Sequence, residues 1–406
     1  MRKQFNIYQL CIFFYILMTL IANDLLIPSF LCTVSIGFLV VSTILYSLHN
    51  YHFVLIKLHY KMFAWYGLFV LVSVISILYS INRTIVNDSS YLLYTTAILL
   101  FCFCTMVDSY EKVIRVMESY AIGAAILFGI LVYTGNLVTG SRLGESFTNN
   151  SNTFAMFMII SFFFTGWLFL YHEKRKTVKA LYAIILIMEF ISILLSGARK
   201  TLFASVVYMV ILLLFRQDGN GRKHIIKNLC IAGGIIAIVC YLILNNAILY
   251  NIIGERMQLL LLQFLGKESA ATMSSAYLRK VYRKLALQGW LRSPIWGHGY
   301  DSFRYLNNSV TGHNAYSHNN YTELLYNTGI IGFLVYYSAY FKIIKNSIGS
   351  ADISSKALSI AGIVGICICE YGQVDYNLII VVIFLFVLHK VNLFANNNNY
   401  AGVGRF

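Results

Sequence analysis

The sequence is short of charged residues and almost free of proline. Only 12% of its 406 residues are charged, whereas 59% are hydrophobic. A soluble domain carries about 25% charged residues, so this chain lacks the polar side chains needed to cover a water-exposed surface. Its two prolines, Pro28 and Pro294, leave long helices uninterrupted, because proline disrupts a helix interior. The composition excludes an ordinary soluble protein.

The hydrophobic residues occur in runs that are long enough to cross a bilayer as helices. Runs of roughly 17–25 apolar residues match a transmembrane helix, whereas the strands of a β-barrel would be shorter and alternating. We therefore predict an all-α, polytopic integral membrane protein with about 12 transmembrane helices. These form a single transmembrane domain over residues 1–395, followed by a cytoplasmic tail at 396–406.

The predicted spans are 5–23, 26–48, 62–82, 89–107, 114–134, 153–171, 177–196, 200–215, 225–245, 320–341, 354–370 and 376–395. The connection at Ser196–Lys200 is so tight that eleven spans remain an alternative. Most of the 31 Lys and Arg residues lie in short loops on one side of this arrangement, which places both termini in the cytoplasm. One long basic segment, 246–318 between spans nine and ten, then becomes a large extracytoplasmic loop.

The formal net charge of +15 does not indicate a nucleic-acid partner. The short cytoplasmic loops account for most of it, and anionic membrane lipids attract such charge. The eight cysteines lie within predicted spans, and the two Cys-x-Cys pairs have no histidine nearby. They are better explained as small buried apolar residues. Because zinc-type spacing and a glycine-rich nucleotide loop are also missing, we predict no metal and no cofactor.

Three polar clusters stand at the predicted outer ends of spans six, eight and ten. They cover residues 141–152, 195–200 and 316–323. Each lies at a helix N-terminus, where free N–H groups and the positive end of the dipole favour an anion. Arg142 lies in the first cluster and Arg199 in the second. The clusters therefore predict an anion-binding pocket on the outer face.

The outer loop adds further candidates. Arg279 and Arg283 lie four residues apart in the amphipathic stretch 277–285 and so share one helical face. A helix on the membrane surface, with arginines touching lipid phosphates, would give the same pattern. His318 precedes span ten, whose positive dipole end should lower the pKa of the imidazole and keep it neutral. Glu323 resembles the acidic member of a capping arrangement with Asn320, which favours a structural role.

Several residues match a known family in order and spacing. They are Arg279, Pro294, Gly297 and Gly299, then His318, Asn319, Tyr321 and Glu323, then Gly329 and Gly332, with the blocks 142–152 and 196–200 upstream. In this order the sequence resembles the O-antigen ligase/polymerase family over roughly residues 140–335, the expected catalytic core. Two departures are visible: residues 149–152 are one residue longer than the family form, so either Asn149 or Asn152 is the matched position, and Ala198 replaces the usual serine.

The resemblance implies a glycosyltransferase that moves a glycan from an undecaprenyl-diphosphate carrier to an acceptor hydroxyl, without a metal ion. It implies that Arg199 and Arg279 hold the diphosphate and that His318 activates or positions the acceptor hydroxyl. The expected substrate-binding residues are Arg142, Asn149, Asn152, Arg283, Asn319, Tyr321 and Glu323. Donor glycan, acceptor glycan and membrane lipids are the expected partners, and a chain-length regulator protein is a further candidate.

We interpret the chain as a polymerase of O-antigen or capsular repeats in the cytoplasmic (inner) membrane of a bacterium, with its active site facing the periplasm or the exterior. A ligase that passes the glycan to lipid A–core is the alternative within the family. A transporter of polysaccharide or lipid-linked oligosaccharide is the alternative from another class. A transporter would hold its polar residues near the bilayer midplane, whereas here they gather at one edge.

Overall fold

The structure is a computed structural model of the whole chain. It describes residues 7–21, 28–50, 60–81, 86–137, 142–145, 150–216, 230, 233–234, 237–238, 240–255, 258 and 275–400. Within these ranges the chain is helical and contains no strand, which confirms the prediction of an all-α protein.

The helical elements follow one another along the chain. They are α1 (Ile7–Ile21), α2 (Phe30–His49), α3 (Tyr60–Ile77), α4 (Val86–Met106), α5 (Tyr110–Tyr133), α6 (Ser151–Trp167), η1 (Leu168–His172), α7 (Lys176–Leu195), α8 (Arg199–Phe215), α10 (Ala247–Leu249), η2 (Tyr250–Gly254), α12 (Ser275–Trp290), α13 (Ser302–Thr311), α14 (Asn320–Ile348), α15 (Ile353–Glu370) and α16 (Ile379–Tyr400).

Most predicted spans coincide with a helix. Within the described ranges, six helices are long and apolar enough to cross a membrane: α2, α3, α5, α6 with η1, α7 and α15. Shorter apolar helices occupy Ile7–Ile21, Ser90–Met106 and Ile379–Ala395. The predicted ninth span, 225–245, lies largely outside the described residues. The chain is therefore a helical membrane protein.

The structure refines two predicted boundaries. Gly197, with φ of +63°, turns the chain between Leu195 and Arg199, so that α7 and α8 are separate helices. The helix α16 continues through the asparagine run to Tyr400, so helical structure extends into the predicted tail. No proline or glycine interrupts that run, and its backbone extends the helix.

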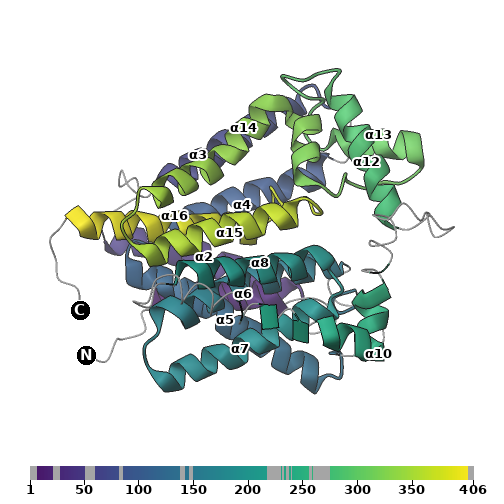
Figure 1. Ribbon diagram of the computed structural model, residues 1–406. Helices are drawn as coiled ribbons and strands as arrows, with labels where there is room; N and C mark the ends of the chain where they lie inside the picture. The colour runs from purple at the N-terminus through teal and green to yellow at the C-terminus, as the bar shows by residue number, and fades with distance from the viewer. Residues whose placement is uncertain are drawn as a thin grey trace.

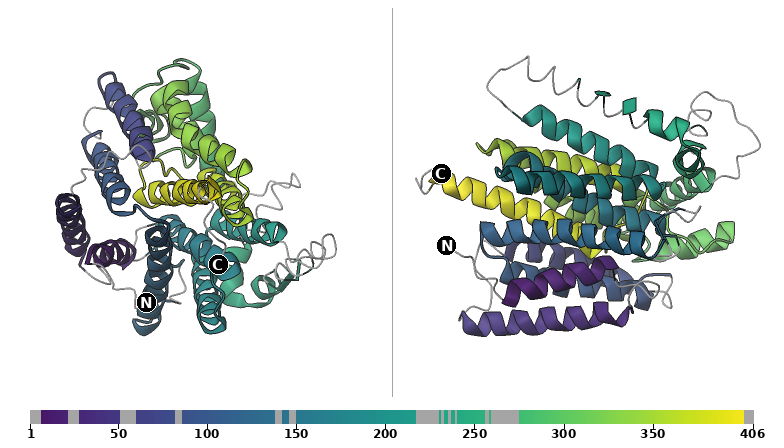
Figure 2. Two further views of the ribbon diagram at one scale, coloured as in Figure 1. Left: turned by 90° about the vertical axis from the view of Figure 1, so that its left-hand side faces the viewer. Right: turned by 90° about the horizontal axis from the view of Figure 1, so that it is seen from below.

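Helices α6, α8 and α15 pack together next to the central helix α16 (Figures 1 and 2). Phe163 of α6 stacks on Tyr208 of α8, with ring centroids 4.2 Å apart. A Cβ atom at Gly365 of α15 would lie only 2.4 Å from the Phe163 ring, so this glycine permits the close approach of α15 and α6. The packing fixes the first turn of α8 against the last turn of α15.

A break in α14 connects it to the turn that follows α12. Gly329 has φ of +64° and ψ of −167°, a conformation that is essentially restricted to glycine. The turn at 294–299 lies across this break, with His298 N–H donating to the Tyr326 carbonyl at 2.8 Å and Ile330 N–H donating to the Pro294 carbonyl at 2.9 Å. The helices α12 and α13 are thereby joined to α14 at one end of the bundle (Figure 1).

Candidate functional site

Two pockets adjoin at the N-terminal ends of α8 and α14. The first, here called the cationic pocket, has a volume of about 40 Å³. Four positively charged side chains line it: Arg142, Arg199, Lys200 and Arg279. The second, here called the loop pocket, has a volume of about 320 Å³ and is lined by Arg279, Tyr282, His318 and the segment 312–315, among others. Arg279 lines both, so the two pockets share a wall.

Arg142 connects the first two polar clusters. Its Nε donates to the Ser196 carbonyl at 2.9 Å, its Nη2 donates to Asn152 Oδ1 at 3.4 Å, and its Nη1 pairs with Glu145 at 3.3 Å. Gly197 makes room for it, because a Cβ there would lie 3.1 Å from Arg142 Nε. The guanidinium is thus held beside the first turn of α8. Arg142 contributes charge to the cationic pocket while fixing its wall.

Lys200 is a further cation of this pocket. Its ammonium lies 5.7 Å from the centroid of the Tyr371 ring. Gly372 gives it space, since a Cβ built on that residue would lie 1.1 Å from Lys200 Nζ. The guanidinium of Arg283 lies over the same Tyr371 ring at 4.8 Å. Arg283 therefore packs against the protein beside Lys200 and lines neither pocket.

His318 faces the loop pocket in a left-handed backbone conformation, with φ of +54°. Its ring stacks on Tyr282, with centroids 6.3 Å apart and planes 15° from parallel. Its Nδ1 has no hydrogen-bond partner among the described residues. Burial, reinforced by the positive charges of Arg279, Lys200 and Arg304, lowers the pKa of His318 to about 3.

The imidazole of His318 is therefore neutral at physiological pH. The direction of the shift agrees with the sequence prediction, but the main cause is different. The prediction invoked the dipole of the following helix, whereas burial dominates and the neighbouring cations add to it. A neutral imidazole with an unused ring nitrogen can accept a hydrogen bond from a hydroxyl group, but a pKa of about 3 makes it a weaker base than a histidine whose pKa lies near the operating pH. An anion bound beside the neighbouring cations would raise this pKa.

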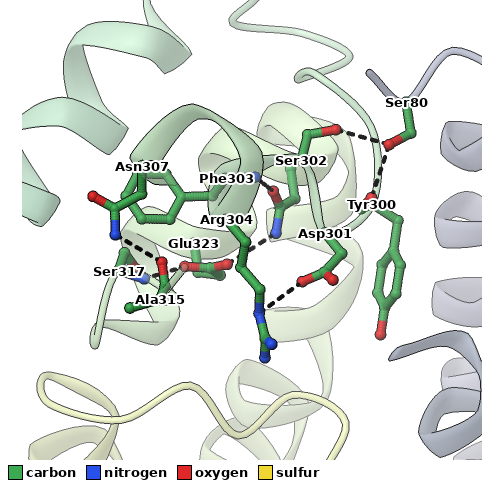
Figure 3. A network of polar contacts seen from close by, with 11 residues as sticks. Ser80, Tyr300, Asp301, Ser302, Phe303, Arg304, Asn307, Ala315, Ser317 and Glu323 are labelled. Atoms are coloured by element: carbon green, nitrogen blue, oxygen red, sulfur yellow. Dashed lines mark hydrogen bonds and ion pairs between the residues drawn. The ribbon is translucent and has the colours of Figure 1, made fainter. Parts of the chain in front are cut away.

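Polar contacts hold the segment that carries His318 (Figure 3). Glu323 is buried and its Oε2 accepts from Ser317 N–H at 2.6 Å, while Oε1 accepts from Asn327 Nδ2 at 3.3 Å. Asn327 Oδ1 in turn accepts from Phe303 N–H at 3.0 Å, and Asn307 Nδ2 donates to the Ala315 carbonyl at 2.9 Å. The network joins α13 and the 315–317 segment to α14. Glu323 therefore stabilises the loop that carries His318.

Asn319, not Asn320, caps α14. Its Oδ1 accepts from Thr322 N–H at 2.9 Å and its Nδ2 donates to the Tyr371 carbonyl at 3.1 Å. Tyr321 donates to the Cys367 carbonyl at 2.8 Å. Asn319, Tyr321 and Glu323, predicted to bind substrate, therefore make contacts within the protein and do not line either pocket. Asn149 lies outside the described residues.

Sequence reasoning missed the segment that follows α15. Gly372 and Gln373 line the cationic pocket, and the buried carboxylates of Glu370 and Asp375 flank them in the sequence. Glu370 accepts hydrogen bonds from Tyr340 at 2.6 Å and from Asn320 at 3.2 Å. Burial, and next the Glu370 carboxylate, raise the pKa of Asp375 well above its usual value. An acid at the end of an apolar run is the signal that could have drawn attention to this segment.

The chemistry of the cationic pocket favours an anionic ligand. Four basic side chains line it and no carboxylate does. In the part of the chain that the structure describes, no three His, Cys, Asp or Glu side chains gather as metal ligands. Arginine presents a planar fork that matches phosphate oxygens, and lysine adds a mobile point charge. The arrangement is suited to a diphosphate, with a neutral imidazole in the adjoining pocket.

The comparison with protein families gives a match inside this chain. Residues 181–337 match the family described as O-antigen ligase. The matched segment runs from α7 into α14 and contains Arg199, Arg279 and His318, whereas Arg142, Asn152 and the segment after α15 lie outside it. No curated protein matches the chain.

Proposed function

We propose that this chain, whose residues 181–337 match the family described as O-antigen ligase, polymerises the repeat units of O-antigen or capsular polysaccharide. Its donor is a glycan linked to undecaprenyl diphosphate, and its acceptor is a sugar hydroxyl of another lipid-linked glycan. The reaction takes place at the outer face of the cytoplasmic membrane of a bacterium. The apolar helices and the family agree on a bacterial membrane protein.

The observation that carries the proposal is the cationic pocket next to a neutral histidine. Arg199 and Arg279 lie in one pocket with Lys200 and Arg142, and Arg279 also borders the pocket of His318. A diphosphate in the cationic pocket would place the anomeric carbon of the donor sugar toward the loop pocket. The acceptor sugar would then occupy the larger loop pocket, which Tyr282 and His318 help to line.

The reaction that fits this geometry is a single displacement. The acceptor oxygen forms a bond to the anomeric carbon while the bond from that carbon to the diphosphate oxygen breaks. The acceptor proton passes to the His318 imidazole, and the electron pair of the broken bond remains on the lipid diphosphate. The arginines stabilise the negative charge that develops there. Attack opposite the leaving group inverts the anomeric configuration.

Two alternatives make different demands on the molecule. A ligase would use the same donor chemistry and pass the glycan to lipid A–core. A transporter would bind its substrate near the bilayer midplane, whereas the cations here gather where α8 begins and α6 starts nearby. The placement at helix ends favours transfer chemistry over transport.

Deletion of the gene, followed by analysis of surface polysaccharide, tests the proposal. A polymerase predicts loss of long chains while a single repeat remains on the core. Loss of all capped core with accumulation of lipid-linked polymer would instead identify a ligase. Loss of surface polysaccharide, with lipid-linked repeats trapped on the cytoplasmic side, would identify a transporter.

A further inference from the structure

A second cationic pocket lies far from the site described above. It has a volume of about 70 Å³, and its walls include Lys61 and Trp65 of α3, Lys342 of α14 and His389 of α16. Lys342 is about six helical turns, roughly 30 Å, beyond the start of α14 at Asn320. This pocket, here called the lysine pocket, therefore opens at the opposite end of the helix bundle from the cationic pocket and the loop pocket.

His389 is the unusual member of this pocket. It is only 4% exposed, and its Nε2 has no hydrogen-bond partner among the described residues. Buried polar groups are nearly always paired, and an unpaired one costs free energy. The imidazole lies in a wall that it shares with two lysines. An unused buried nitrogen beside two positive charges points to a ligand that accepts hydrogen bonds and carries negative charge.

The lysines have the charge that such a ligand needs. Lys61 and Lys342 are exposed, and no described Asp or Glu forms an ion pair with either. Trp65 is held as a wall by donation from its Nε1 to the Val335 and Tyr336 carbonyls, at 2.9 and 3.0 Å. Cytoplasmic topology alone explains exposed lysines. It does not explain why a buried imidazole with a free nitrogen stands behind them.

We propose that the lysine pocket binds a phosphate-type oxyanion, presented either by the headgroup of an anionic lipid or by free phosphate. Lys61 and Lys342 supply the positive charge, and the His389 imidazole donates a hydrogen bond from its Nε2–H. The position of the pocket at one end of the bundle suits a lipid phosphate at the membrane surface. This site is separate from the transfer reaction and goes beyond it.

The test is a ligand-dependent thermal shift of the purified full-length chain in detergent. Phosphatidylglycerol is compared with phosphatidylcholine of the same acyl chains, and sodium phosphate with sodium chloride at equal ionic strength. We expect the unfolding midpoint to rise with phosphatidylglycerol, with phosphate, or with both. A rise with the lipid alone identifies a headgroup site, and a rise with both identifies the phosphate group itself as the ligand.

Variants locate the effect. The double change Lys61→Gln and Lys342→Gln should weaken the apparent affinity by about tenfold or more, since two charge-assisted contacts are lost. His389→Gln should weaken it as well. Lys345→Gln is the matched control, because Lys345 is exposed on the next turn of α14 and does not line the pocket.

Two results would overturn the inference. One is the absence of any shift that distinguishes phosphatidylglycerol from phosphatidylcholine or phosphate from chloride. The other is an equal loss in Lys345→Gln and in the double variant, which would reduce the effect to general surface charge. Because the readout is binding rather than glycan transfer, its failure is distinguishable from failure of the proposed function.

Discussion

Replacing Gly372 by alanine should drive Lys200 out of the cationic pocket. A Cβ atom at residue 372 would lie 1.1 Å from Nζ, 1.9 Å from Cε and 2.1 Å from Cδ of Lys200. These are the three nearest heavy atoms, and all belong to a flexible side chain. Gly372 also has no positive φ. The substitution therefore displaces one ammonium without straining the backbone.

The Gly372→Ala variant should transfer glycan more slowly, because it loses the contact that Lys200 would make with the diphosphate. A hydrogen bond to a charged group contributes about 1.5–3 kcal/mol, which corresponds to a roughly 10–150-fold slower transfer if it is made in the transition state. The unfolding midpoint should change little. The assay is the rate of glycan transfer by the purified variant, with the midpoint measured on the same sample.

A double-mutant cycle separates this explanation from general damage. Lys200→Ala removes the side chain that the new Cβ at residue 372 would meet. The double variant should therefore transfer glycan at almost the same rate as Lys200→Ala alone. If the two substitutions multiply their effects, or if Gly372→Ala leaves transfer unchanged, Lys200 does not act through this pocket.

Four further predictions concern the arginines, His318, the break in α14 and the absence of a metal requirement. Arg279→Lys keeps the charge but loses the planar fork, and should slow transfer by roughly 10²–10³-fold at matched membrane abundance. Arg283→Lys should cost only a few-fold, because this guanidinium packs on Tyr371, and equal losses in both would misplace the site. The pKa of His318 is about 3 in the folded protein and near 6.5 in the unfolded chain. Between these values the unfolded chain binds a proton that the folded protein does not, so the free energy of unfolding should fall as the pH drops from about 6.5 toward 3. His318→Asn should flatten that part of the denaturation profile, and an unchanged slope would show that His318 does not titrate as described. Gly329→Ala should lower the unfolding midpoint strongly, since its Cβ would meet the Ile295 carbonyl oxygen at 2.2 Å, and an unchanged midpoint would contradict the packing of that turn. Transfer should persist in a chelator of divalent cations, and full loss that magnesium restores would refute a mechanism based on fixed cations.

The fold class was predictable because the bilayer imposes a length on each helix. Apolar runs marked the helices from α1 to α8 and from α14 to α16, and positive charge suggested their orientation. The break in α14 was not predictable, because the sequence does not show which segment the motif glycines pack against. Only the structure shows that Gly329 meets the turn at 294–299 through backbone hydrogen bonds.

The candidate site was predictable in part. Arg142 and Arg199 stood out because cations at helix N-termini on the predicted outer side are unusual. Arg279 stood out by its place in the amphipathic stretch 277–285 and in the family motif, and the structure brings these three to one pocket. Asn319 and Glu323 carried motif positions but serve the loop that holds His318. The contribution of Gly372 was beyond sequence reasoning, since it depends on how closely α15 approaches α8 in three dimensions.

The most direct test of the central claim is transfer by the purified chain in vesicles with a synthetic oligosaccharide linked to undecaprenyl diphosphate as the sole glycan. The account predicts a ladder of longer lipid-linked products, formed with inversion at the anomeric carbon and absent from Arg279→Ala. A chain that makes no product with this donor, or an Arg279→Ala variant that makes the same ladder, would contradict it.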